Sequence, residues 1–134
     1  MGPTATALVG FGTWLVLLTI ALALYRGYVG ATTGKPLNSF QPDGSDMPGF
    51  GRRLTRARDN CFETLPVFAV IVLGAQLSGR LDVTNGLAPW VLYSRIAQSV
   101  THIISTSVPA VLLRGTMLGV QLVIYLYWAS RLLG

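Results

Sequence analysis

The chain has 134 residues, of which 51% are hydrophobic and only 11% are charged, and its formal net charge is +5. This composition excludes an intrinsically disordered chain and is unusual for a soluble domain. Nucleic-acid binding is a weak interpretation of the positive charge, because most basic residues lie in or beside one segment next to an apolar run, where membrane topology already accounts for them. We expect one domain that spans residues 1–134.

The first apolar run covers residues 5–25 and is long enough to cross a bilayer as a helix. A cleaved signal peptide is the alternative, since Ala21-Leu22-Ala23 resembles a cleavage site, but no basic residue precedes the run. We therefore expect a retained transmembrane helix that ends at Arg26. Without a targeting signal, a bacterial inner membrane is the expected location.

The segment 26–51 is rich in glycine and proline and also contains serine, threonine, asparagine and aspartate. It contains turn sequences such as Gln41-Pro42-Asp43-Gly44, which disfavour a helix. A loop of this length is usually functional or disordered. We expect it to form a flexible cap over the inner end of a helix bundle.

The second predicted helix, residues 52–79, begins with polar residues and continues as an apolar span. Arg56, Asn60 and Glu63 are spaced i, i+4 and i+7, so on a helix they lie within about 60° of one another. Ionisable groups at the mouth of a membrane helix are costly and indicate a functional site. Cys61, the only cysteine in the chain, points about 140° away from Arg56, and we interpret it as a small apolar filler.

The third predicted helix, residues 87–108, carries a polar stripe along one face. Its members lie within about 60° of Arg95, so they should face other helices rather than lipid. They are Arg95, Gln98, Ser99, His102 and Thr106.

The fourth predicted helix, residues 111–133, carries Arg114 in its first turn. Gly115 and Gly119 form a pair that permits close helix contact. Three aromatic residues near the far end predict an aromatic belt at the membrane surface: Tyr125, Tyr127 and Trp128.

Six basic residues on or beside the first loop predict that this loop faces the cytoplasm: Arg26, Lys35, Arg52, Arg53, Arg56 and Arg58. With four spans, both termini then face outward. The polar residues of three different helices consequently fall at similar depth, in the cytoplasmic half: Arg56, Asn60, Glu63, His102 and Arg114.

The pattern Arg56-Ala57-x-x-Asn60-x-x-Glu63-Thr64-x-Pro66-x-Phe68 resembles the helix-2 signature of the MAPEG family, the membrane-associated proteins in eicosanoid and glutathione metabolism. The similarity continues in Tyr93-Ser94-Arg95 and His102, and in Pro109 followed by Leu113-Arg114. The resemblance implies an all-α membrane protein, a bundle of four transmembrane helices assembled as a homotrimer. It also implies glutathione bound between subunits in the cytoplasmic half.

The resemblance further implies roles for individual residues. Arg56, Asn60 and Glu63 would contact glutathione, and His102 would join them there, while Arg114 would stabilise the thiolate and so act as the catalytic residue. Arg95 would form a structural ion pair with Glu63. This chain departs from several family members, which carry tyrosine at the positions of His102, Thr64 and Leu118.

The chemistry of these side chains fits glutathione, but each has a structural alternative. Arg56 and Arg114 are also suited to anchoring helices at the membrane surface, and Asn60 to a hydrogen bond between helices. His102 is also suited to an interhelical hydrogen bond. A metal site is not expected, because the chain has one histidine and one cysteine.

The leading functional hypothesis is a glutathione-dependent transferase or peroxidase that acts on lipophilic electrophiles or hydroperoxides in the membrane. The alternative is a non-catalytic trimeric membrane scaffold or lipid-binding protein of the same fold. A small transporter is a third hypothesis, suggested by the polar stripe of the third helix. The expected partners are other copies of the chain, membrane lipids and a lipophilic substrate, with no nucleic acid.

Overall fold

The computed structural model describes residues 1–47 and 49–134, and within them all regular structure is helical. Pro48, which belongs to the predicted first loop, lies outside these residues. A loop from residue 34 to 49 joins the first two of the four long helices, and the segment between the second and third holds a single helical turn. The helices are α1 (Pro3–Thr33), α2 (Phe50–Leu77), α3 (Asp82–Asn85), α4 (Ala88–Ile104) and α5 (Val108–Leu133).

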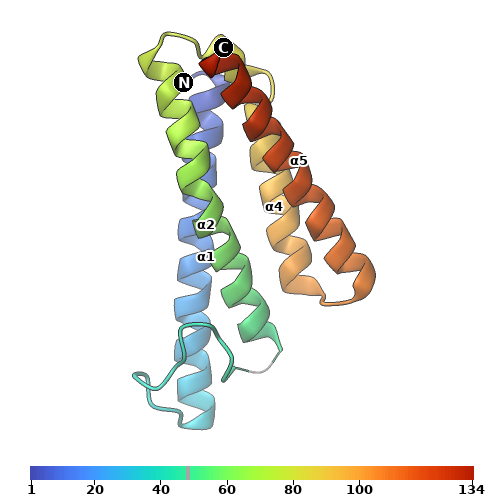
Figure 1. Cartoon of the computed structure of the whole chain (residues 1–134). Helices are drawn as coiled ribbons and strands as arrows, with labels where there is room; N and C mark the ends of the chain where they lie inside the picture. The colour runs from blue at the N-terminus through green and yellow to red at the C-terminus, as the bar shows by residue number, and fades with distance from the viewer. Residues whose placement is uncertain (48) are drawn as a thin grey trace.

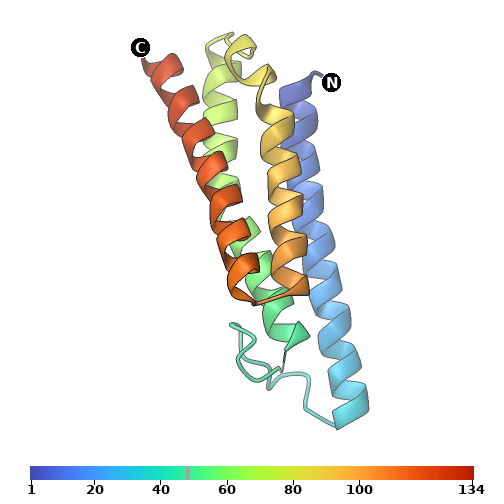
Figure 2. The same ribbon diagram turned by 90° about the vertical axis from the view of Figure 1, so that its right-hand side faces the viewer.

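The four long helices run alongside one another, and α4 contacts α1, α2 and α5 (Figures 1 and 2). Both termini and the α2–α4 connection lie at one end of the bundle, whereas the α1–α2 loop and the α4–α5 connection lie at the other (Figure 1). We call the latter the loop end. The predicted all-α bundle of four helices is confirmed. By length and composition, α1, α2 and α5 can cross a membrane, and α4 is shorter, with 17 residues.

Helix α1 continues past Arg26 to Thr33, so the expected end at residue 26 is wrong. A single arginine ends an apolar run but does not disturb the backbone hydrogen bonds of a helix. The helix ends instead at Gly34, which adopts a φ of 74° and donates its N–H to the Gly30 carbonyl. The first loop is consequently shorter than predicted and begins at residue 34.

The α4–α5 boundary also differs from the prediction. Helix α4 ends at Ile104 rather than near 108, and α5 begins at Val108 rather than 111. The break falls at Ser107, whose hydroxyl accepts a hydrogen bond from the Ala110 N–H at 3.4 Å. Pro109 therefore occupies the first turn of α5, where its missing N–H costs nothing.

Aromatic side chains fill the centre of the bundle. Phe68 lies 5.5 Å from Phe11 and 6.0 Å from Trp128, between ring centroids. Tyr125 and Trp128 are 4% and 0% exposed, so for them the predicted membrane-surface belt is wrong, whereas Tyr127 is exposed. The α5 face that carries them turns toward α2, and burial in the core takes precedence over the position near the helix end.

A hydrogen-bonded polar layer crosses this core. Arg95 is fully buried and its Nη2 donates to Gln121 Oε1 at 2.8 Å. Gln121 Nε2 in turn donates to Gln98 Oε1 at 3.0 Å. The Arg95 guanidinium also lies 5.6 Å from the Phe11 ring centroid, within range of a cation–π interaction. The predicted inward orientation of the polar stripe is confirmed for Arg95, Gln98, Ser99 and His102, which are all buried. Thr106, the fifth predicted member, is exposed and lies beyond the end of α4.

Candidate functional site

Two polar hollows adjoin each other at the loop end of the bundle. The first hollow has a volume of about 280 Å³ and is lined by Asp43, Arg52, Arg56, Asp59, Asn60, Glu63 and His102. The second hollow has a volume of about 370 Å³ and is lined by Gly49, Arg52, Arg53, Arg56, His102, Thr106, Val111 and Arg114. They share Arg52, Arg56 and His102, which therefore form the border between them. All five predicted ligand-binding residues line one hollow or both.

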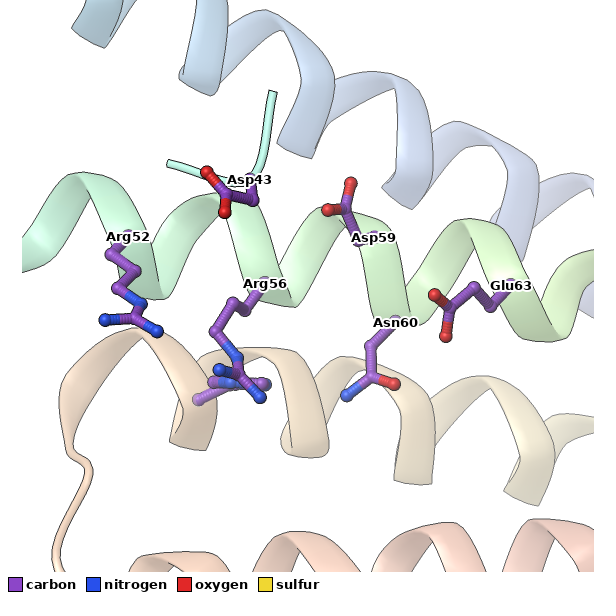
Figure 3. Close-up of a pocket in the computed structure, with 7 residues that line it drawn as sticks. Asp43, Arg52, Arg56, Asp59, Asn60 and Glu63 are labelled. Carbon is purple, nitrogen blue, oxygen red and sulfur yellow. The ribbon is translucent and has the colours of Figure 1, made fainter. Parts of the chain in front are cut away.

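Helix periodicity positions the α2 side chains of the site. Arg56 and Asn60 project from α2 toward α4, and Glu63 lies further along the same helix (Figure 3). Arg52 stands one turn before Arg56 and extends the same face. The start of α2 is fixed against the end of α4, because Arg53 Nε donates to the Ile103 carbonyl at 2.6 Å.

The other two predicted residues reach the site from α4 and α5. His102 is 5% exposed, lies in the last turn of α4 and lines both hollows. Arg114 lies in the second turn of α5, half-buried, and lines the second hollow. Among the described residues, His102 Nδ1 and Arg114 Nε have no hydrogen-bond partner. Both side chains thus retain hydrogen-bonding capacity for a ligand.

Charge divides the site into two unlike halves. The first hollow combines the carboxylates of Asp43, Asp59 and Glu63 with two guanidinium groups. The second hollow is lined by four arginines and His102, with no acidic residue among its lining side chains. An elongated ligand with a zwitterionic end and a purely anionic end matches this division.

The expected ion pair between Glu63 and Arg95 does not form within the subunit. Arg95 points into the core, where Gln121 accepts from it, whereas Glu63 is exposed and lines the first hollow. At the position of Arg95, the polar stripe of α4 and the polar face of α2 are therefore not joined by an ion pair. Glu63 is left available to a ligand, and Arg95 is held by amide side chains.

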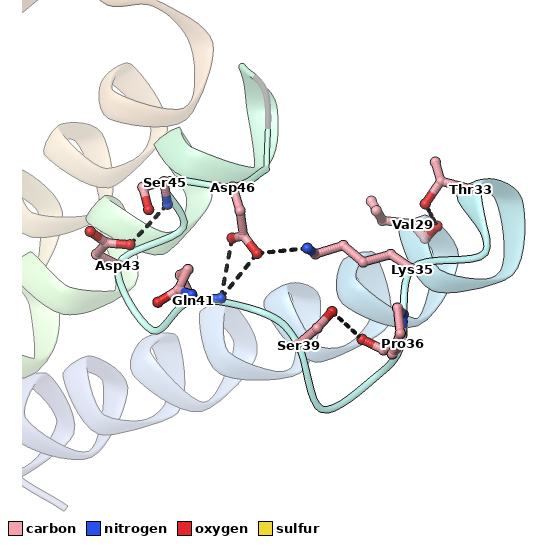
Figure 4. Close-up of polar contacts among 9 residues, drawn as sticks. All are labelled: Val29, Thr33, Lys35, Pro36, Ser39, Gln41, Asp43, Ser45 and Asp46. Atoms are coloured by element: carbon pink, nitrogen blue, oxygen red, sulfur yellow. Dashed lines mark hydrogen bonds and ion pairs between the residues drawn. The ribbon is translucent and has the colours of Figure 1, made fainter.

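The loop between α1 and α2 delivers Asp43 to the first hollow (Figures 3 and 4). Asp43 Oδ1 accepts from the Ser45 N–H at 3.0 Å, and this hydrogen bond lowers the pKa of the carboxyl group. Asp46 pairs with Lys35 at 3.0 Å, and the hydrogen bond from Lys35 lowers the Asp46 pKa as well. Asp46 also accepts from the Gln41 N–H, so Asp46 joins two separate positions of the loop, Lys35 and Gln41.

Sequence reasoning did not assign five polar residues of the site: Asp43, Arg52, Arg53, Asp59 and Thr106. For Arg52 a signal was present, because it precedes Arg56 by four residues. Asp59 stands four residues before Glu63, a spacing that predicts repulsion unless a cation lies near. Asp43 had no such signal, since its place depends on the path of the loop.

Replacing Gly44 with alanine is expected to lift the loop away from α2. Gly44 has a φ of 73°, and an added Cβ would lie 2.7 Å from Thr55 Oγ1 and 3.3 Å from the Arg52 Cα. Hydrogen exchange of the 41–47 amides should therefore accelerate several-fold. Gly34→Ala is the matched control, because Gly34 has a similar φ of 74° but open space around the added Cβ. Equal effects of the two substitutions would contradict a seated loop.

The fold and the long apolar helices define a multi-pass integral membrane protein with a polar site at one end of its bundle. The MAPEG family model matches residues 4–134, so the chain belongs to the MAPEG family. This family consists of glutathione-related membrane enzymes with a four-helix fold. Searches of curated proteins and of solved structures found no match.

Proposed function

We propose that this protein is a membrane enzyme that uses glutathione as its thiol co-substrate, as a transferase or peroxidase for lipophilic molecules. One observation carries the proposal. Residues from three helices, selected from the sequence as glutathione ligands, line two adjoining hollows at one end of the bundle: Arg56, Asn60, Glu63, His102 and Arg114. Membership of a family of glutathione-related membrane enzymes also supports the proposal.

The functional groups of glutathione match those of the lining side chains. Arg56 can hold a carboxylate with two parallel hydrogen bonds, and Asn60 offers both a donor and an acceptor to a peptide amide. Glu63 can accept hydrogen bonds from the ammonium group. Arg114 suits the thiolate, because the charged side chains that line the second hollow are all arginines.

The thiolate is the nucleophile in this chemistry, whereas a thiol with a pKa of about 8.5 is mostly protonated at neutral pH. The thiol proton leaves to solvent, and the cationic hollow stabilises the sulfur anion. With an electrophile, the sulfur forms a bond to carbon and a leaving group departs with its electron pair. With a hydroperoxide, the sulfur attacks the O–O bond and releases an alcohol. A second glutathione then converts the resulting sulfenic acid to a disulfide and water.

We further propose a homotrimer with the loop end facing the cytoplasm. Arg56 and Glu63 are exposed in a single subunit, so a neighbouring subunit would complete the walls around them. Gly115 and Gly119 have open space beside their Cα atoms, which leaves room for a close contact from outside the subunit. The basic residues at and beside the loop support the cytoplasmic orientation.

The alternative function, a non-catalytic scaffold or lipid-binding protein, is favoured by one observation. No tyrosine is among the described residues that line either hollow, although several family members carry tyrosine at the positions of Thr64, His102 and Leu118. In a scaffold the polar residues serve assembly, so Glu63→Ala would destabilise the trimer and Arg114→Ala would leave it intact.

Titration of the purified, detergent-solubilised protein with glutathione tests the proposed function. We expect saturable binding by calorimetry, together with the ultraviolet absorbance of a thiolate at neutral pH. S-Methylglutathione serves as the control, because it retains the carboxylates and ammonium but cannot ionise at sulfur. A folded trimer that neither binds glutathione nor develops thiolate absorbance would contradict the enzyme and favour the scaffold.

A further inference from the structure

The first hollow contains more negative charge than the helix-2 pattern alone supplies. Glu63 belongs to that pattern, but Asp43 comes from the loop and Asp59 from a neighbouring position on α2. Building on the proposed function, we propose that Asp43 selects ligands with a free ammonium group, by adding a loop carboxylate to the two that α2 contributes to this hollow. The adjacent guanidinium groups of Arg52 and Arg56 then bind the carboxylate on the same ligand carbon. The first hollow thus recognises the α-amino acid end of the ligand.

Contacts within the loop and between the loop and α2 hold Asp43 beside the first hollow. Its Oδ1 accepts from the Ser45 N–H, and the next residue, Gly44, lies against Thr55 and Arg52 of α2. Figure 3 shows the Asp43 and Asp59 carboxylates on one side of the first hollow, with Arg56 and Asn60 on the other. The negative and positive sides of the hollow therefore face a common space.

The cations nearest to these three carboxylates do not neutralise all of them. Lys35, the only lysine in the chain, is bound to Asp46 at 3.0 Å (Figure 4). Its ammonium group also lies 5.3 Å from the centroid of the Phe40 ring. Arg58 contacts one oxygen of Asp59, its Oδ1, at 3.0 Å. Three like charges around one space repel each other unless a cation lies between them. Arg52 and Arg56 also line this hollow, so its lining holds three carboxylates and two guanidinium groups, and an ammonium group would balance the third carboxylate.

A second, independent feature indicates a ligand in the same hollow. His102 is 95% buried by side-chain packing, and its Nδ1 has no hydrogen-bond partner among the described residues. Buried polar atoms are rarely left unpaired, and because His102 also lines the first hollow, a molecule bound there can supply the partner. A metal ion is not suited to this hollow, because no group of three His, Cys, Asp or Glu side chains among the described residues is arranged to hold one. An ammonium group has three donors that can be shared between a carboxylate and water, so it does not need three converging carboxylates.

Asp43→Asn tests the proposal with little disturbance, because the amide oxygen can still accept from the Ser45 N–H. The probes are glutathione and its desamino analogue, in which hydrogen replaces the amino group while both carboxylates and the thiol remain. Calorimetry on the full-length protein in detergent gives the ratio of the two affinities. Asp82→Asn, the same change on exposed α3 at the opposite end of the bundle, is the control.

Wild-type protein should prefer glutathione over the desamino analogue. Asp43→Asn should reduce this preference about three- to tenfold through weaker glutathione binding, with unchanged affinity for the analogue, as expected for loss of one partly exposed charge contact. Asp82→Asn should leave the preference unchanged. If Asp43→Asn retains the full preference, or if the wild type binds both probes equally, this inference is overturned while the proposed function stands. If the wild type does not bind glutathione at all, both are overturned.

Discussion

Arg114→Ala is expected to lower kcat/KM for glutathione conjugation about 100-fold at neutral pH. Arg114 is half-buried in a hollow without acidic side chains, and its Nε has no partner among the described residues. If its charge lowers the pKa of the bound thiol by about 2 units, it stabilises the thiolate by about 2.7 kcal/mol. Removing that stabilisation corresponds to a rate loss of about two orders of magnitude.

The decisive measurement is the pH dependence of thiolate absorbance in the complex. The thiol pKa should rise by about 2 units in Arg114→Ala, and activity should recover at alkaline pH as the thiol ionises unaided. Arg131→Ala is the matched control, since Arg131 lies exposed in the last turn of the same helix, far from both hollows. An unchanged thiol pKa in Arg114→Ala would assign Arg114 to anchoring rather than catalysis.

Gln121→Leu is expected to produce the largest loss of stability, about 2–3 kcal/mol of unfolding free energy. Gln121 is fully buried and joins Arg95 to Gln98 through two hydrogen bonds. Leucine would leave the Arg95 guanidinium with no hydrogen-bonding side chain among its described neighbours, and a buried charge without a partner is costly.

Unfolding of the solubilised protein with increasing sodium dodecyl sulfate, followed by circular dichroism, measures this loss. Gln76→Leu makes the same chemical change on the exposed end of α2 and should have little effect. Glu63→Gln should likewise leave the stability of the subunit nearly unchanged, since Arg95 is held by Gln121. A large effect of Glu63→Gln with none for Gln121→Leu would restore the ion pair that the resemblance implies.

The sequence predicted the bundle and the convergence of the site because both depend on periodicity. Helical spacing placed Arg56, Asn60 and Glu63 on one face of α2, and that face is where they lie. Because successive helices cross the membrane in opposite directions, the end of α4 with His102 and the start of α5 with Arg114 lie at the same end of the bundle as the start of α2. Such inferences need only the rise and turn of a helix and the length of each span.

Features that depend on contacts between particular side chains were not predictable from the same patterns. Arg95 was expected to pair with Glu63, but its hydrogen-bond partner is Gln121. The sequence could not show this, because a single sequence gives no distances between helices. Asp43 reaches the first hollow only because Gly44 allows the loop to approach Thr55. The predicted end of α1 was wrong because hydropathy shows where the apolar, membrane-spanning part of a helix ends. The helix itself can continue beyond the membrane.

Helix α4 is unfavourable to insert into a membrane by itself, because its 17 residues include a buried arginine, a glutamine and a histidine. At the centre of an isolated span an arginine costs about 2.5–3.5 kcal/mol during insertion by the translocon. Alone, α4 is therefore a poor candidate to leave the translocon for lipid, whereas α5 brings with it the amide that accepts from that arginine. We expect α4 and α5 to partition together as a hairpin, so that a nascent chain truncated between them stays out of the bilayer core.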